Sequence, residues 1–176
     1  MSEDQLSPII ALLALLTAAG SVALAVSISA PGAYNLRATL IERGRWLSFI
    51  VAAGAMSGSL YYSEVANFVP CEFCWYQRIA MYPLAAILLI AAITRDAGIA
   101  RYVIPIAAIG LAISGYHYQL QLFPEQSTVC TSGVPCTVRY VDAFGFVSIP
   151  FMAGCGFLSI LALQVATLRA RQAQAA

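Results

Sequence analysis

The segment CEFC, residues 71–74, places two thiols three positions apart, and Arg78 follows the second thiol by four residues. This cysteine spacing occurs in redox-active dithiols, in half-sites for zinc and in haem attachment. Haem attachment requires a histidine directly after the second cysteine, and Trp75 stands there instead. Disulfide exchange and zinc binding therefore remain as the two chemistries to weigh.

A second cysteine pair, Cys130 and Cys136, follows later in the chain. A glycine and a proline between them favour a turn that brings the two within bridging distance. Four cysteines allow three pairings, and the spacing favours one disulfide within each pair. Zinc binding by all four fits less well, because the five residues inside the second pair exceed the usual spacing of a half-site. Two disulfides that only staple an outer loop are the structural alternative.

The residues after the first pair favour a reactive thiol. Cys74 is expected near the beginning of an apolar helix, where unpaired backbone N–H groups stabilise a thiolate. Arg78 lies one helical turn further on, shares a face with Cys74 and adds positive charge. A stabilised thiolate at a membrane surface can donate electrons to an acceptor dissolved in lipid, and it is a good leaving group in exchange. An arginine that only reaches for the membrane interface is the simpler interpretation of Arg78.

The elements that carry these residues are predicted to be transmembrane helices. Hydrophobic residues make up 61% of the 176 residues and charged residues only 10%, whereas a soluble domain carries roughly 25% charged residues. We therefore predict an all-α integral membrane protein. The net charge of +1 gives no field that would attract nucleic acid, and no such partner is expected. Helices spanning a bilayer need about 20 apolar residues, and five runs are candidates: 9–30, 47–68, 79–94, 102–123 and 150–168.

The arginines predict the orientation, because cytoplasmic loops retain positive charge. Seven of the nine arginines lie in segments 31–46, 95–101 and 169–176, which alternate with the other connections. The N-terminus is then outside, the C-terminus is cytoplasmic, and both cysteine pairs share the outer face. An oxidising outer compartment favours disulfides over zinc thiolates. The first run follows acidic residues without a basic one, so it is expected to be a permanent helix and not a cleaved signal peptide.

Three stretches resemble the DsbB/BdbC family of disulfide bond formation proteins, especially its short-loop, Bacillus-type BdbC branch. They are GSLYYSEVANFVPCEFCWYQRIAMYP (58–83), YHYQLQLFP (116–124) and CTSGVPCTVRYVDAFGFVSIPF (130–151). The resemblance covers about residues 47–168. It implies a four-helix transmembrane bundle in the bacterial cytoplasmic membrane, a quinone (ubiquinone or menaquinone) as electron acceptor, and no metal. The implied partner is a thioredoxin-like extracytoplasmic thiol oxidase of the DsbA/BdbD type.

The resemblance also implies roles for single residues. Cys71 and Cys74 match the quinone-proximal pair, and Cys74 matches the cysteine that reacts with the quinone. Arg78 matches the arginine that supports the quinone. His117, near the outer end of the fourth helix, is a candidate to hydrogen-bond a quinone carbonyl; an interfacial histidine is the equal alternative. The Cys71–Cys74 disulfide would be the oxidised form of this pair.

Cys130 and Cys136 match the loop pair that meets the partner protein, with Cys130 attacked first and Cys130–Cys136 as the disulfide that is reduced. The short separation between them departs from the long-loop branch, which leaves the order of attack open. Phe144, Phe146 and Ile149 are expected to dip the loop into the membrane interface and so to hold Cys130 and Cys136 near the membrane.

The chain also has a helix that the four-helix family core lacks. We expect residues 1–46 to form this additional transmembrane helix and a cytoplasmic loop, 47–168 the thiol-oxidase domain, and 169–176 a cytoplasmic tail. The resemblance assigns the additional helix no task. The loop 31–46 is a candidate for a short amphipathic helix on the cytoplasmic side.

Three rival functions use similar parts. A quinone reductase resembling vitamin K epoxide reductase carries its C-x-x-C after the loop pair, whereas here it comes first. A transmembrane electron conduit needs several cysteines inside the bilayer, and Cys155 is the single candidate. A non-enzymatic scaffold with structural disulfides is the third rival, and a Cys74→Ser variant that folds but loses activity would exclude it.

Overall fold

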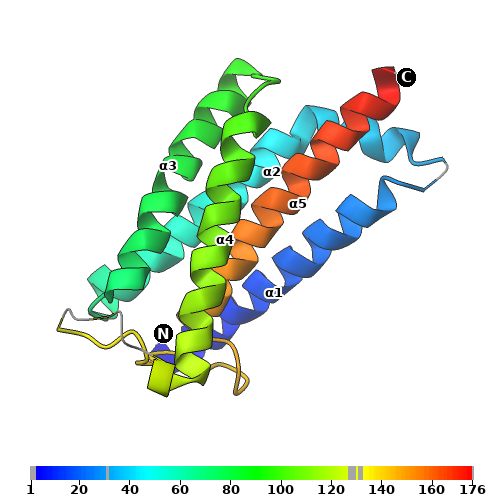
Figure 1. The fold of residues 1–176 in the computed structure, drawn as a ribbon. Helices are drawn as coiled ribbons and strands as arrows, with labels where there is room; N and C mark the ends of the chain where they lie inside the picture. Colours follow the sequence, from blue (N-terminus) through cyan, green and yellow to red (C-terminus); the bar gives the residue numbers. More distant parts are fainter. Residues whose placement is uncertain (1–2, 31, 127–129, 131–132, 176) are drawn as a thin grey trace.

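The computed structural model describes residues 3–30, 32–126, 130 and 133–175 (Figure 1). Within them the chain is helical and contains no strand, apart from one isolated bridge between Ala143 and Val147. The predicted all-α class is therefore confirmed. The five α-helices are α1 (Glu3–Ser27), α2 (Tyr34–Leu60), α3 (Glu72–Thr94), α4 (Ala100–Leu122) and α5 (Ile149–Ala175). A π-helical turn, η1 (Tyr61–Val65), continues α2, and a short 3₁₀ turn, η2 (Pro124–Gln126), follows α4.

Helix α5 is the centre of the bundle. It packs against α1, α2 and α4, while α3 packs against α2 and α4. Figure 1 shows α1 and α3 on opposite sides of α5. The core between α3, α4 and α5 includes Leu84, Leu88, Phe157 and Ile160, all fully buried. Gly110 lets α4 approach α5 here, because a Cβ at this position would lie 2.3 Å from the Phe157 ring.

Four of the helices are long and apolar enough to cross a membrane, over Leu6–Ser27, Glu72–Thr94, Ala100–Leu122 and Ile149–Gln174. They fit a multi-pass membrane protein. The fifth predicted span, 47–68, corresponds to the second half of α2 and to η1. Helix α2 is not among the four, because its first half contains Arg37, Glu42, Arg43 and Arg45.

The segment 31–46 was expected to be a loop and a candidate for a short amphipathic helix, and most of it is helical. From Tyr34 onward these residues are helical and continuous with the rest of α2. No proline interrupts the segment, and Leu40 is buried in a cluster with Ile28, Leu163 and Ala166 from α1 and α5. Packing of this face explains why the helix begins well before the apolar run.

The arginine-rich segments and the cysteines lie at opposite ends of the bundle (Figure 1). The loop between α4 and α5 and the beginning of α1 share one end, where α3 also begins. The turn between α3 and α4 and the end of α5 share the other end, and Arg171 donates a hydrogen bond there to the Ala97 carbonyl. The two ends therefore differ in chemistry: both cysteine pairs lie at one end, and seven of the nine arginines lie in the segments at the other.

Candidate active site

The first cysteine pair occupies the beginning of α3. Cys71 is the N-cap residue, with extended backbone (φ −74°, ψ 174°), and Cys74 lies in the first turn. Cys71 is buried and Cys74 is half-buried, and their Sγ atoms are 2.9 Å apart without a bond. Both cysteines are free thiols here, and the Cys71–Cys74 disulfide expected for the oxidised form of the pair stays a prediction.

His117 of α4 connects this pair with the loop. Its side chain is 1% exposed, and Nε2 lies 3.2 Å from the Cys136 carbonyl oxygen and 3.5 Å from Cys71 Sγ. A carbonyl oxygen can only accept, so Nε2 carries the hydrogen. The same N–H can then stabilise a thiolate on Cys71. One histidine nitrogen therefore contacts both cysteine pairs.

The pKa of Cys71 is lowered to about 4. The hydrogen bond from the Cys74 thiol is the largest cause, burial opposes it, and the hydrogen bond and charge of His117 lower the pKa further. The sequence argument expected the thiolate on Cys74. Cys74 lies in the first turn of α3, as expected, but Cys71 is the N-cap residue and lies next to His117, which favours the thiolate on Cys71.

The second pair, Cys130 and Cys136, is joined by a disulfide with a Cα–Cα distance of 6.1 Å. Cys136 is 1% exposed and packs with Cys71, Phe73 and Leu120. Cys130 and Val134 lie at the margin of this cluster. The structure therefore combines an oxidised loop pair with a reduced helix pair, and both pack into the same apolar cluster.

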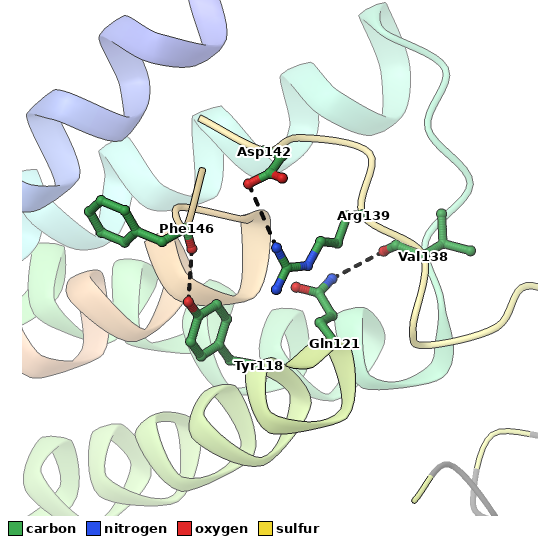
Figure 2. A network of polar contacts seen from close by, with 6 residues as sticks. All are labelled: Tyr118, Gln121, Val138, Arg139, Asp142 and Phe146. Atoms are coloured by element: carbon green, nitrogen blue, oxygen red, sulfur yellow. Dashed lines mark hydrogen bonds and ion pairs between the residues drawn. The ribbon is translucent and has the colours of Figure 1, made fainter. Parts of the chain in front are cut away.

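Helix α4 holds the loop in place through two hydrogen bonds to its backbone (Figure 2). Tyr118 donates its hydroxyl to the Phe146 carbonyl at 2.9 Å, and the Gln121 amide donates to the Val138 carbonyl at 3.1 Å. Both donors lie within one turn of His117 on α4. The loop end that carries Cys136 is therefore fixed relative to the histidine.

Further contacts tie the loop to itself and to the segment before α3. Arg139 and Asp142 form an ion pair at 3.7 Å, also drawn in Figure 2. The Tyr140 ring stacks on Phe68 with centroids 4.7 Å apart, and its hydroxyl donates to the Val69 carbonyl at 3.3 Å. These contacts bring the loop against the approach to Cys71. Phe144 and Phe146 remain largely exposed.

A small cavity of about 20 Å³ lies beside the helix pair, where Pro135, Val138 and Tyr140 of the loop also contribute to its wall. Its walls include Cys71, Cys74, His117 and Gln121. His117 Nδ1 and Gln121 Oε1 are buried and have no hydrogen-bond partner among the described residues. Since a cavity of at least about 10–15 Å³ can hold one water molecule, a single water there would satisfy both atoms and give His117 a proton partner.

A much larger cavity of about 830 Å³ runs between α1, α2, α3 and α5. Cys74 and Arg78 line it, and apolar side chains make up most of the wall. Arg78 donates from Nε to Ser59 Oγ at 3.0 Å and from Nη2 to the Ser59 carbonyl at 3.1 Å. Tyr82 donates to the same hydroxyl at 3.3 Å. This is the shape and chemistry of a pocket for a mostly apolar ligand with a polar head.

His117 does not line the large cavity. Its position differs from that expected for a residue that hydrogen-bonds a quinone carbonyl, because its ring packs against Phe73 and faces the cysteine pairs. Of the four redox cysteines, Cys74 is the one that lines both cavities. It stands between the large pocket and the loop pair.

Three potential metal ligands meet at the helix pair. The Sγ atoms of Cys71 and Cys74 and a ring nitrogen of His117 lie within 4.8 Å of one another, the one such group among the described residues. The disulfide between Cys130 and Cys136 removes the other two thiols, so a site made of four cysteines is not formed. A soft metal at the remaining three ligands would block the dithiol.

Comparison with known proteins places the chain in a family. The family model described as "Disulfide bond formation protein DsbB" matches residues 42–167. The chain belongs to the DsbB family. It is 51% identical over 126 residues to a probable disulfide formation protein of Oceanobacillus iheyensis, which covers 70% of this chain and 87% of the relative. It is 50% identical over 118 residues to disulfide bond formation protein C of Bacillus subtilis, covering 66% and 86%. No solved structure matches.

The family membership supports a role in disulfide bond formation, as expected from the motifs around both cysteine pairs. Two features of the site were not anticipated from the sequence. Ser59 anchors Arg78 from another helix, 19 positions away, and no short-range pattern signals it. The α1 side of the large cavity was also missed, because the family motifs start after that helix.

Proposed function

We propose that this DsbB-family protein is a membrane thiol:quinone oxidoreductase. It reoxidises a thioredoxin-like extracytoplasmic thiol oxidase and passes the electrons to membrane quinone. The observation that carries the proposal is the position of Cys74, which lines the large apolar cavity and also packs in the cluster that contains Cys130 and Cys136. A residue so placed can take electrons from one side and deliver them on the other.

The reaction begins at the loop. One thiolate of the reduced partner attacks Cys130 Sγ, and Cys136 leaves as a thiolate. The second partner thiol displaces Cys130, so the partner gains a disulfide and the loop pair becomes a dithiol. The loop dithiol then reduces a Cys71–Cys74 disulfide by the same two exchanges, which restores the Cys130–Cys136 disulfide.

The product of this exchange is a thiolate on Cys71 and a thiol on Cys74, with the second proton released to solvent. The lowered pKa of Cys71 favours that product. His117 stabilises the Cys71 thiolate through its Nε2 hydrogen.

Re-forming the Cys71–Cys74 disulfide releases two electrons and the Cys74 proton. A quinone bound in the large cavity accepts two electrons and two protons, the second proton coming from solvent. The residues fit such a ligand: the volume is in the usual range for small-molecule sites, and the polar groups gather around Cys74, Arg78 and Tyr82. Arg78 would orient an oxygen of the head group and neutralise charge that develops on it.

For the membrane we propose the bacterial cytoplasmic membrane, with the cysteine end outside and the arginine-rich end in the cytoplasm. The separation of thiols and arginines between the two ends supports this orientation. Residues 47–168 would then form the thiol-oxidase domain, 1–46 the added N-terminal part and 169–176 a cytoplasmic tail.

The test is quinone reduction by the purified protein in lipid nanodiscs, with a reduced thioredoxin-like oxidase as electron donor. We expect quinol to form in proportion to partner disulfide. Cys74→Ser should abolish turnover, whereas Cys155→Ser, a matched change at a buried cysteine outside both cavities, should retain it. Turnover by the Cys74→Ser variant, or partner oxidation without quinol, would contradict the proposal.

A further inference from the structure

Helix α1 is fixed to the rest of the molecule at both ends. Near the cysteine end, Tyr62 donates its hydroxyl to Ser7 at 3.3 Å, and both side chains are buried. At the other end, Arg37 of α2 donates to the Ile28 carbonyl at 3.0 Å, just past the end of α1. Cations are favourable at a helix C-terminus. The helix is therefore a built part of the fold, although the family match begins only at residue 42.

Between these two anchors α1 packs against α5, and the large cavity separates it from α2. The α1 wall of the cavity includes Ile10, Leu13, Thr17 and Gly20, which recur at helical spacing and so share one face. This wall is a different surface from the α2 and α3 walls that hold Ser59 and Arg78. One wall of the cavity thus belongs to helices within the family match, and the other belongs to α1, which lies before that match.

The cavity is elongated along the helices. On α2 its walls run from Leu47 to Ser59, a separation of twelve residues or about 18 Å at 1.5 Å per residue. The polar groups Arg78, Tyr82 and Ser59 lie at the end near Cys74, and the deeper part is lined mainly by apolar and small side chains. A ligand that fills it needs a polar head and a long, narrow apolar chain.

We propose that α1 and α2 together form a binding channel for the polyprenyl tail of the quinone, so that the added helix makes the enzyme selective for long-tailed acceptors. This inference rests on the proposed function, since it assigns the tail of the same acceptor. The head lies against Cys74 and Arg78, and the tail runs between α1 and α2 toward the level of Gly20 and Gly54. In a four-helix relative this tail would be surrounded by lipid on the α1 side.

Two glycines allow the channel to be filled without disturbing packing. Gly20 on α1 and Gly54 on α2 both line the cavity, and a Cβ at either position meets no atom within 4 Å. Phenylalanine at Gly20 would occupy the part of the channel far from the head, and phenylalanine at Gly54, five residues from Ser59, would occupy its middle. Gly115 on α4 is the matched control: it also has nothing within 4 Å, and it lines neither cavity.

The experiment compares quinol formation with a long-tailed quinone and with a tailless quinone, using Gly20→Phe, Gly54→Phe, Gly115→Phe and the unmodified chain in nanodiscs. We expect the two channel variants to raise KM for the long-tailed quinone at least tenfold and to change KM for the tailless one less than twofold. Gly115→Phe should change neither. An equal loss with both quinones, or no change with either, would overturn the channel. Absence of quinol from the unmodified chain with both would instead overturn the proposed function.

A second readout does not depend on turnover. A long-tailed quinone carrying a photoreactive group at the tail terminus is crosslinked to the protein in nanodiscs, and the labelled peptides are mapped. We expect label on α1 near Gly20, and its loss in Gly20→Phe. Label confined to α3, α4 or lipid would overturn the proposal. Native mass spectrometry gives a further check. A phospholipid that stays bound to the protein when long-tailed quinone is in excess would also overturn the proposal.

Discussion

Replacing His117 by phenylalanine tests the link between the two cysteine pairs. The change removes the Nε2 hydrogen 3.5 Å from Cys71 Sγ while keeping a ring against Phe73. A hydrogen bond to a charged group contributes about 1.5–3 kcal/mol, and one pKa unit corresponds to about 1.36 kcal/mol. The pKa of Cys71, about 4 in the structure, should therefore rise by roughly one to two units.

The measurement is the pH dependence of alkylation of Cys71 in the reduced helix pair, quantified on its peptide by mass spectrometry. The unmodified chain should give a midpoint near pH 4. His117→Gln retains an N–H donor and serves as the control for a merely structural role; it should keep most of the effect. A midpoint unchanged in His117→Phe, or moved equally by both variants, would refute the role of the imidazole.

The sign of the pH dependence follows from the same shift. The pKa of Cys71 is lower in the folded dithiol form, about 4, than in an unfolded chain, where a thiol titrates near about 8.5. This contribution to the stability of the dithiol form is fully present above pH 8.5 or so and is lost as the pH falls through 4.

At a pH above the pKa of Cys71, reduction of the Cys71–Cys74 disulfide takes up one proton, at Cys74. The reduction potential of the Cys71–Cys74 pair should therefore fall by about 30 mV per pH unit above pH 4. Uptake of two protons would give roughly 60 mV per pH unit. Redox titration at several pH values measures this slope.

Three further predictions concern the remaining site residues. Arg78→Met should raise the KM for quinone tenfold to hundredfold, because a lost charge-assisted hydrogen bond costs about 1.5–3 kcal/mol. Arg78→Lys should raise the KM by a smaller factor. Unchanged kinetics in both variants would mean that Arg78 serves only to anchor Ser59. Cys136→Ser should accumulate a mixed disulfide between Cys130 and the partner oxidase, visible on non-reducing gels, and an adduct through Cys71 would exclude the loop as entry point. After reduction, an impermeant thiol reagent should label Cys130 from outside intact cells, and labelling only after lysis would reverse the orientation.

The sequence predicted the membrane-spanning helices and the clustering of the cysteine pairs because both depend on local patterns. Apolar runs and arginine distribution are properties of single segments, so their interpretation needed no tertiary information. Helix α2 shows the limit of this approach. Its charged first half was expected to be a loop or a short separate helix, yet it is helical and continuous with the apolar half, and Leu40 is buried against α5. A hydropathy pattern reports where a segment is apolar, and not where its backbone stops being helical.

The placement of the thiolate shows a second limit. The sequence predicted a helix start and a cation close to the dithiol, and the structure has both. Which of the two sulfurs gains the charge depends on the first helical residue and on a histidine 46 positions from Cys71. Neither is encoded in the spacing of the motif. Likewise, Arg78 is oriented by Ser59, a contact made only when α2 and α3 pack.

The spacing of the dithiol gains a further meaning from the two cavities. Residues three positions apart at a helix start are neighbours, yet the first is still at the N-cap and the second is inside the helix. Here this difference turns Cys71 toward His117 and the loop disulfide, while Cys74 reaches the large apolar cavity. The same two sulfurs, 2.9 Å apart, therefore face the loop disulfide on one side and the large apolar cavity on the other. A longer separation would break the sulfur–sulfur contact, and a pair placed deeper in the helix would lose the loop.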